Sequence, residues 1–251
     1  MPILGVIASA FAPPPASPVL TGLLQWYDAS DGSTITKSAD RVSAWQNKAS
    51  GYPYTVVQAT SGQQPLWVSA GKNGKDLLRW TNARNDLMAL ATAFAPGKGA
   101  RKMTFFVACK ITSTLQGGIY VTGRDAGSGG GWMPASVTLT NGKMSYQTGS
   151  GGSAVTATSV TTNTSLIHGV NHDIQAVTQK VIYGATTDTT TVTGLTLDVG
   201  GGSGGYTPGV GFNILAGAAD MDFYEVLFYA STLSGADYTK NIDYLKAKWG
   251  I

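Results

Sequence analysis

Three carboxylates lie close together near the C-terminal end of the chain, in the segment Asp220-Met221-Asp222-Phe223-Tyr224-Glu225. Glu225 is the only glutamate of the protein. A glycoside can be cleaved with retention by two carboxyl groups about 5 Å apart, one a nucleophile and one an acid/base. On a regular strand Asp220 and Asp222 share a face and Glu225 points away, unless a bulge intervenes. We therefore interpret the three as strand residues, with a catalytic pair as the alternative.

The two histidines of the chain form a second candidate cluster, in His168-Gly169-Val170-Asn171-His172. At this spacing both side chains point to one face of a strand. Of the residue types that bind transition metals, only Asp173 stands next to them, and a zinc site needs more ligands. We interpret them as hydrogen-bonded sheet histidines, and we predict neither a metal site nor a cofactor.

Two aromatic residues stand beside glycine-rich segments and are candidates for sugar binding. Trp132 follows the Gly127–Gly131 segment, and Tyr206 follows the Gly200–Gly205 segment. An aromatic ring at the edge of a loop can stack on the face of a sugar ring. Trp132 and Tyr206 are thus the predicted glycan-binding residues, with loop anchors packed on the domain as the alternative.

The composition limits the classes of partner. Charged residues make up 12% of the chain and hydrophobic residues 43%, with a net charge of +3 and no run of Lys or Arg, so nucleic acid is not an expected partner. The single cysteine, Cys109, excludes an intramolecular disulfide and lies in an apolar run typical of a buried strand.

The elements that carry these residues are short apolar runs separated by turn residues, including 33 glycines. This pattern predicts an all-β sandwich. The sequence Asn141-Gly142 predicts a two-residue hairpin turn. The expected strands are Leu23–Asp28, Tyr54–Gln58, Asp76–Trp80, Met103–Ile111, Gly118–Val121, Trp132–Leu139, Lys143–Gln147, Ile174–Tyr183, Val192–Leu197, Phe212–Ala216 and Asp222–Tyr229.

One helix is predicted, from Ser234 to Trp249. Ser234 is a capping residue, Asp237 stands three residues later, and Gly250 can end the helix. Tyr238, Ile242, Leu245 and Trp249 fall on one face. Such a helix at the end of a β-protein is expected to cover one face or end of the sandwich.

Three blocks of sequence resemble the laminin-G-like group of concanavalin A-like jelly rolls. They are the front block Leu24–Asp31 with Val42–Lys48, the segments Gln63–Pro65 and Asn73–Trp80, and the closing block Glu225–Tyr229, Leu233-Ser234 and Tyr244–Gly250. The resemblance implies a concanavalin A-like jelly-roll β-sandwich over residues 20–251, with residues 112–200 matched poorly. The fold hosts lectins, adhesins, virion proteins and glycosidases, so it does not by itself imply a function.

The carboxylate segment is also similar to the Glu-x-Asp-x-x-Glu strand of laminarinase-like glycosidases. That resemblance would make Asp220 the nucleophile, although aspartate replaces glutamate at this position. Laminin-G-like folds often bind calcium, for which Asp125 and Asp220 are the candidate donors. No calcium-loop signature is present, and whether calcium is bound stays open.

The N-terminal residues are strongly apolar, and Pro13-Pro14-Pro15-Ala16-Ser17-Pro18 follows them as a stiff, extended spacer. The segment is too short to span a bilayer, and no Lys or Arg precedes it as in a signal peptide. The opening Met1–Ser9 resembles the start of tailed-bacteriophage virion proteins. We expect residues 1–19 to dock the domain to an assembly through their large apolar side chains, Ile3, Leu4, Val6, Ile7 and Phe11.

Together these observations predict a bacteriophage virion structural protein (a capsid decoration, head-fibre or tail component) that is not an enzyme. Its expected location is the virion. Its expected partners are capsid or tail proteins, a second copy of the chain and host surface glycans, with no membrane span. A bacterial carbohydrate-binding module is the first alternative, and a laminarinase-like glycosidase is the second.

Overall fold

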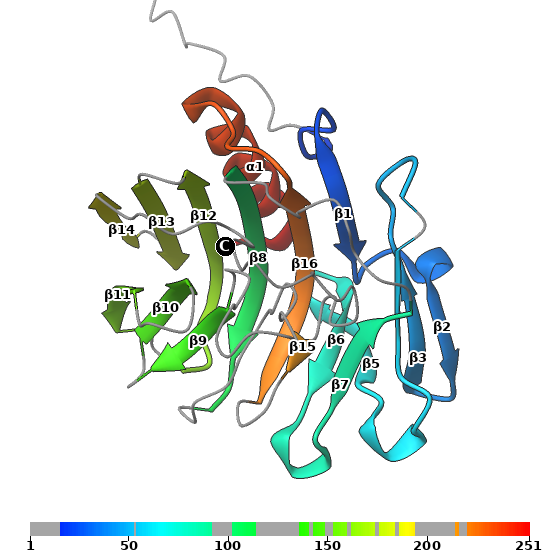
Figure 1. Cartoon of the computed structure of the whole chain (residues 1–251). Coiled ribbons are helices and arrows are strands. Elements are labelled where there is room, and N and C mark those ends of the chain that lie inside the picture. The colour runs from blue at the N-terminus through cyan, green and yellow to red at the C-terminus, as the bar shows by residue number, and fades with distance from the viewer. Residues whose placement is uncertain are drawn as a thin grey trace, which may run out of the picture.

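The structure of the protein is a computed structural model. It describes residues 16–52, 54–91, 102–113, 136–140, 143–148, 153–159, 162–173, 176–183, 186–193, 214–215 and 220–251. In these ranges the chain is mostly β-strand and has one α-helix at its C-terminal end (Figure 1). The prediction of an all-β sandwich with one C-terminal helix is confirmed. The boundary drawn near residue 20 stays a prediction, because residues 1–15 lie outside these ranges.

The first half of the chain contributes seven strands before residue 91. They are β1 (Leu23–Asp28), β2 (Ile35–Ser38), β3 (Arg41–Gln46), β4 (Thr55–Val57), β5 (Leu66–Lys72), β6 (Lys75–Trp80) and β7 (Leu87–Leu90). The second half contributes β8 (Lys102–Ile111), β9 (Ser136–Thr140), β10 (Lys143–Thr148), β11 (Ser153–Ser159), β12 (Ser165–Asp173), β13 (Ala176–Tyr183), β14 (Thr186–Thr193), β15 (Ile214–Leu215), β16 (Met221–Tyr229) and the helix α1 (Gly235–Trp249).

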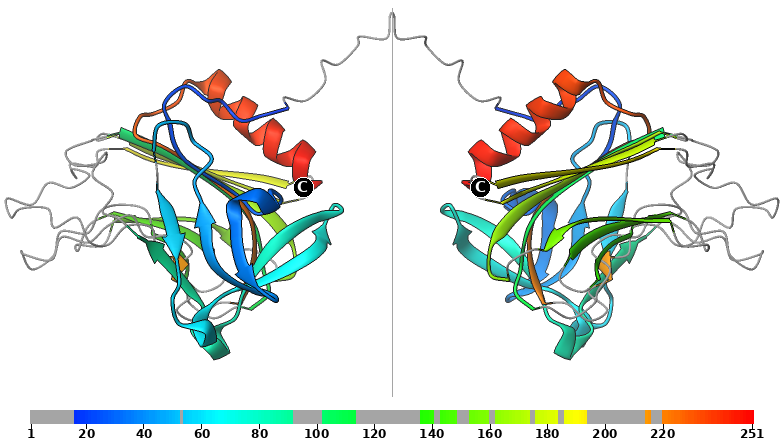
Figure 2. Two further views of the ribbon diagram at one scale, coloured as in Figure 1. Left: turned by 90° about the vertical axis from the view of Figure 1, so that its right-hand side faces the viewer. Right: turned by 90° about the vertical axis from the view of Figure 1, so that its left-hand side faces the viewer.

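The strands form a 13-stranded sheet and a three-stranded sheet. The larger sheet runs in the order β14-β13-β12-β8-β16-β6-β5-β3-β4-β7-β15, and β1 and β2 pair with β16 and β3. The smaller sheet has the order β11-β10-β9. The helix covers the outer face of β8, β12 and β16, and the three-stranded sheet lies on the opposite side of these strands (Figure 2).

Strand β16 is the central element of the sandwich. All nine of its residues are buried, as its largely apolar sequence, interrupted only by Asp222 and Glu225, predicts. One edge of β16 pairs with β8, and the other edge pairs first with β6 and then with β1. Because β16 is shared in this way, it brings the chain's front strand beside the C-terminal helix.

Two apolar cores lie on the two faces of this central strand. The core inside the sandwich includes Tyr27, Trp45, Trp80, Phe105, Val107, Phe223, Val226 and Phe228. The core under the helix includes Phe106, Ile167, Tyr224, Leu227, Tyr229, Tyr238, Leu245 and Trp249. Cys109 is fully buried in the first core, and burial raises the pKa of its thiol, as expected for a packing residue.

The helix begins and ends as its sequence predicts. The Ser234 hydroxyl accepts a hydrogen bond from the backbone N–H of Asp237, and it donates one to that residue's carboxylate. Gly250 follows the last turn with a φ of 62°, in the left-handed region that favours glycine. No helix in the described ranges is both long and apolar enough to cross a membrane.

The chain that leads into β1 is fixed to the helix. The backbone N–H of Val19 donates to the Asn241 amide oxygen at 2.9 Å, and the Tyr229 hydroxyl donates to the Val19 carbonyl at 2.7 Å. Asn241 is fully buried. These contacts fix Val19 beside the helix.

Several strands differ from those expected. The expected strands do not include β12, whose apolar pattern is interrupted by glycine and polar residues, although its two histidines were interpreted as sheet residues. Val192 and Thr193 of the expected strand Val192–Leu197 lie in β14, which begins earlier, at Thr186, and the rest of that expected strand lies outside the described residues. The Asn141-Gly142 prediction is supported by β9 and β10, in which Thr140 pairs with Lys143. The expected strand Gly118–Val121 lies outside the described residues.

Candidate functional site

Asp222 lies in the centre of the sheet between two cations. It is paired across strands with Arg79 on β6 and with Lys110 on β8. Arg79 donates to the carboxylate through Nε at 2.6 Å and through Nη2 at 3.1 Å, and the Lys110 ammonium lies 2.9 Å from it. Asp222 is 1% exposed. Both of its oxygens are thus occupied by structural partners.

Asp220 stands just before β16 and has a different structural role. Its carboxylate accepts a hydrogen bond from the backbone N–H of Asn82 at 2.8 Å. Its own backbone N–H donates to the Ser113 hydroxyl at 2.8 Å. Asp220 therefore joins the start of β16 to two neighbouring loops.

Glu225 lies on the helix side of β16 because the strand contains a bulge. The pairing of β16 with β8 shifts register between Phe223 and Glu225. As a result, the alternation of faces breaks at this point: Phe223 and Val226 pack in the inner core, and Tyr224 and Leu227 pack under the helix. A regular strand was the expectation, and only the tertiary structure shows the bulge.

Four side chains surround the carboxylate of Glu225. The Trp26 indole N–H (2.6 Å) and the Tyr244 hydroxyl (2.7 Å) donate to Oε1, and the Trp249 indole N–H and the Lys248 ammonium (each 2.8 Å) donate to Oε2. Glu225 is fully buried, and burial raises its pKa although Lys248 opposes the shift. The three carboxylates of the sequence motif therefore serve separate structural contacts, and neither Asp222 nor Glu225 is open to a substrate.

The two histidines are buried in β12, as predicted for sheet residues. The His168 Nε2 atom lies 2.9 Å from the Gln179 amide oxygen on β13, and the ring meets Phe105 edge-on. Burial lowers the pKa of His168 and of His172 to about 4 in each case. Among the described residues, no group of three or more potential ligands could hold a metal ion.

The remaining predicted site residues lie outside the described part of the chain. They are the glycan candidates Trp132 and Tyr206, the docking residues Ile3, Leu4, Val6, Ile7 and Phe11, and the calcium candidate Asp125. Their roles stay predictions.

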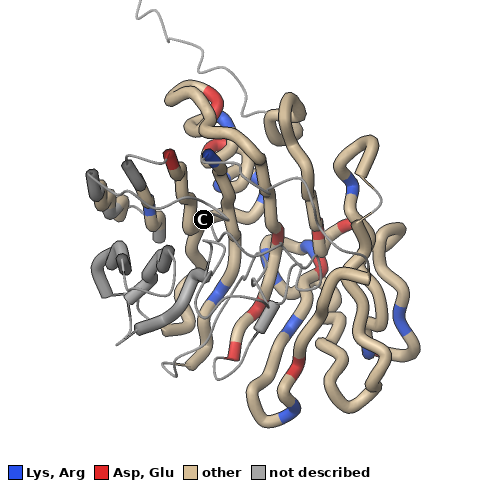
Figure 3. Tube along the Cα trace, viewed as in Figure 1, with Lys and Arg blue, Asp and Glu red and all other residues tan. Residues whose placement is uncertain are grey.

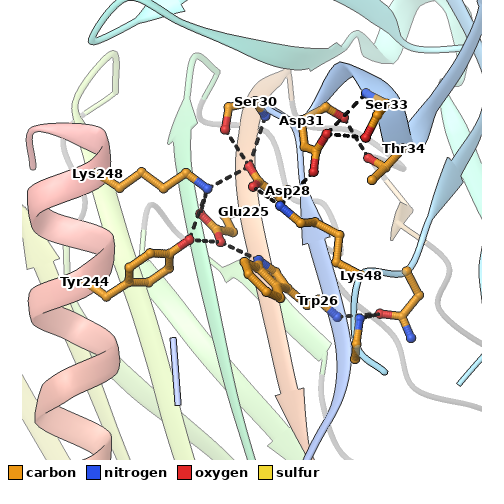
Figure 4. Close-up of polar contacts among 12 residues, drawn as sticks. Trp26, Asp28, Ser30, Asp31, Ser33, Thr34, Lys48, Glu225, Tyr244 and Lys248 are labelled. Carbon is orange, nitrogen blue, oxygen red and sulfur yellow. Dashed lines mark hydrogen bonds and ion pairs between the residues drawn. The ribbon is translucent and has the colours of Figure 1, made fainter. Parts of the chain in front are cut away.

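The structure instead brings together a cluster of charges that the sequence analysis did not identify (Figure 4). Asp28, at the end of β1, is paired across strands with Glu225, and it is 4% exposed. The Lys248 ammonium lies 2.7 Å from Asp28 and 2.8 Å from Glu225, so that one cation joins both carboxylates. Charged residues are sparse along the chain, and several gather where β1, β16 and the helix meet (Figure 3).

Lys48 extends this cluster toward the solvent. Its ammonium lies 2.8 Å from Asp28 and 2.8 Å from Asp31, and it stands 4.4 Å above the centre of the Trp26 ring. Hydrogen bonds to Asp28 and Asp31 raise the pKa of Lys48 despite its burial. Burial alone would raise the pKa of Asp28, but contacts with Lys248 and Lys48 outweigh it, and that pKa is lowered. Lys48 and Asp28 thus stay charged at neutral pH.

A pocket of about 500 Å³ opens beside this cluster, at the C-terminal end of α1. This volume lies within the range of small-molecule sites, roughly 300–1,000 Å³. The pocket wall is mainly polar and has two aromatic residues: Ala16, Trp26, Asp28, Ser30, Lys48, Asn73, Lys75, Tyr244, Ala247 and Lys248. Asp28, Lys48 and Lys248 in this wall are held in place by ion pairs, so the wall presents fixed polar groups to a hydroxyl-rich or charged ligand.

Sequence reasoning missed the pocket because its walls come from five separate segments. Trp26 and Tyr244 stood in the blocks that carry the laminin-G-like resemblance, and neither was predicted as a site residue. One signal did exist: the only glutamate of the chain lies inside an apolar strand, and a buried carboxylate requires partners elsewhere. That signal does not name the partners.

Known proteins share the fold of this chain without detectable sequence similarity. No family model matches it, and no curated protein does. A mutant of Trypanosoma rangeli sialidase displaying trans-sialidase activity superposes with a TM-score of 0.54 at 12% identity, over 93% of this chain and 34% of the sialidase. T. rangeli sialidase in complex with the inhibitor DANA also gives 0.54, at 9% identity, over 87% of this chain and 32% of the sialidase. A GH54 α-L-arabinofuranosidase gives 0.54 at 11% identity, over 90% of this chain and 63% of the enzyme.

These structures correct one expectation. The chain spans about a third of the length of the sialidases, and at such identities the likeness shows the fold alone. The β-sandwich is nevertheless one that occurs in glycosidases, and this finding overturns the expectation that the protein is not an enzyme. The resemblances to laminin-G-like domains and to phage N-termini find no support in these comparisons.

Proposed function

We propose that this chain is a glycan-binding β-sandwich and that the pocket at the end of α1 holds the sugar. The observation that carries the proposal is the polar wall, in which Asp28, Lys48 and Lys248 are fixed by mutual contacts of 2.7–2.8 Å. Rigid polar groups beside an aromatic residue are suited to sugar hydroxyls. The fold, shared with chains of carbohydrate-active enzymes, supports the same class of ligand.

The pocket can be closed without removing any of its contacts. Ala247 is exposed on the last turn of α1 and lines the pocket, so Ala247→Trp should fill it. Ala236 is exposed on the first turn of the same helix and does not line the pocket, so Ala236→Trp is the matched control. Neither change removes a hydrogen bond.

The experiment is a glycan array, followed by affinity measurements on the oligosaccharides that bind. We expect Ala247→Trp to weaken binding at least tenfold, and we expect Ala236→Trp to bind as the wild type does. Equal binding by Ala247→Trp would exclude the pocket, and an array without any binding would contradict the function. The bound oligosaccharides should also be assayed for cleavage, because chains with this fold occur in glycosidases.

We further propose that the domain is displayed on a bacteriophage virion, as a capsid decoration, head-fibre or tail component. The supporting observation is the apolar N-terminal segment, whose five large side chains could contribute roughly 1.5–3 kcal/mol each when fully buried against a capsid or tail protein or a second copy. A bacterial carbohydrate-binding module is the alternative setting. Deletion of residues 1–12 should leave a folded domain that no longer joins the particle, and wild-type occupancy would contradict this proposal.

A further inference from the structure

The hairpin between β5 and β6 places two lysines directly opposite each other. Lys72 pairs with Lys75 across the strands. Between them, Asn73 and Gly74 have φ angles of 49° and 68°, as a two-residue turn of this kind requires. Like charges in directly opposite positions destabilise a strand pair. A compensating interaction is therefore expected at this hairpin tip.

The C-terminal end of α1 provides that interaction for one of the two lysines. The Lys72 ammonium donates to the Gly250 carbonyl at 3.2 Å, and the Asn73 amide donates to the Lys248 carbonyl at 3.0 Å. A cation beside the last carbonyls of a helix is favourable. The side chain of Lys75 has no hydrogen bond or ion pair among the described residues, yet it lines the pocket.

The other charged groups of the pocket have already used most of their bonding capacity. An ammonium has three donors, and that of Lys248 contacts Asp28, Glu225 and the Tyr244 hydroxyl. The carboxylate of Asp28 accepts from Ser30, Lys48 and Lys248.

The lysines therefore retain the unused charged donors of the pocket. Counting only partners in the described part of the chain, Lys75 has all three donors free, and Lys48, which contacts Asp28 and Asp31, has one. A ligand that complements this wall must bring acceptor oxygens, and the strongest partner for a free ammonium is an anion.

We propose that the pocket selects glycans that carry an anionic group, a carboxylate or a sulfate, and that Lys75 binds this group. The inference rests on the proposed function, because it names the ligand class of the same pocket. Lys75 is a specificity residue in this arrangement: it adds a charge-assisted hydrogen bond to a site whose other charges are already paired. Neutral sugars lack the group that would use it.

The experiment compares pairs of ligands in which one member carries the anionic group and the other does not. Trigalacturonate and 3′-sialyllactose are each titrated beside their own methyl esters, and 3′-sulfolactose is titrated beside lactose. The variant is Lys75→Gln. Lys240→Gln is the matched control, since Lys240 is exposed near the start of α1 and 63% of its side chain is accessible. Thermal unfolding verifies that both variants fold.

We expect at least one acidic ligand to bind about tenfold more tightly than its neutral counterpart. Lys75→Gln should remove this preference without changing the affinity for the neutral ligand. It should also make the affinity for the acidic ligand less dependent on salt concentration. Lys240→Gln should keep the preference for the acidic ligand. Preference for the carboxylates or for 3′-sulfolactose will tell which anionic group is recognised. Equal affinity for charged and neutral ligands, or a preference that survives in Lys75→Gln, overturns the inference while glycan binding itself stands. A glycan array without any binding would contradict both the proposed glycan binding and the preference for anionic glycans.

Discussion

Asp28 and Glu225 face each other across the β1–β16 ladder and share the ammonium group of Lys248. They come from opposite ends of the chain and are paired directly in the register of the two strands. Lys248 lies 2.7 Å from one carboxylate and 2.8 Å from the other. This arrangement joins the first strand, the central strand and the last helical turn, so it links the stability of the fold to the shape of the pocket.

Removal of the shared cation should be costly. Lys248→Met keeps the length of the side chain but leaves two buried carboxylates with less compensation, and breaking such a buried pair typically costs about 3–5 kcal/mol. Urea unfolding at pH 7 measures the decrease in the free energy of unfolding. Lys240→Met, on the exposed start of the same helix, should change the free energy of unfolding by less than about 0.5 kcal/mol. A loss below about 1 kcal/mol for Lys248→Met would show that the cluster does not stabilise the fold.

The buried histidines should make the protein sensitive to moderate acid. Burial lowers the pKa of His168 to about 4, below the ordinary value of 6.5, so the unfolded chain binds the proton first as the pH falls. The contribution of the neutral, buried His168 to the free energy of unfolding is therefore fully present above pH 6.5, and it is lost as the pH falls from 6.5 to 4.

The free energy of unfolding that is lost because of His168 approaches about 3 kcal/mol near pH 4. Unfolding free energies at pH 7, 5.5 and 4 test this, with His168→Gln as the comparison. The variant should lose about half of the dependence in this range, because the pKa of His172 is also lowered to about 4. An unchanged pH dependence in the variant would rule out His168 as its source.

Gly169 should not tolerate a side chain. A Cβ atom at this position would overlap the Tyr238 hydroxyl and would lie 2.9 Å from a ring carbon of Phe106. Gly169→Ala should therefore destabilise the protein by roughly 1–3 kcal/mol. The same substitution at Gly62, where nothing lies within 4 Å, is the control. Adding Tyr238→Phe should recover part of the loss, because it removes the overlapping hydroxyl. No recovery would place the strain on Phe106 instead.

The contact that holds the start of the domain can be released separately. Asn241→Ala removes the acceptor for the Val19 N–H and a donor to the Tyr229 hydroxyl, and it should cost about 1–3 kcal/mol because both contacts are buried or half-buried. Hydrogen exchange should show faster exchange at the Val19 amide, with β12 and β13 unaffected. Faster exchange throughout the sheet would instead indicate global unfolding.

The sequence by itself determined the all-β class, the central strand β16 and the helix. These features depend on neighbouring residues: a largely apolar run, a serine cap followed by Asp237, and Gly250 after the last turn. Local turn chemistry likewise predicted that Thr140 pairs with Lys143. The placement of both histidines in a strand was also predicted from the sequence.

Only the tertiary structure decided the surroundings of Glu225 and the existence of the pocket. The register shift in β16 turns this carboxylate toward the helix, and its partner Trp26 lies 199 residues away in the sequence. A bulge and a long-range strand register are set by the packing of the whole sandwich, not by neighbouring residues. Asp28, Lys48, Lys75 and Lys248 could each be found in the sequence, but the fold alone brings them to one site.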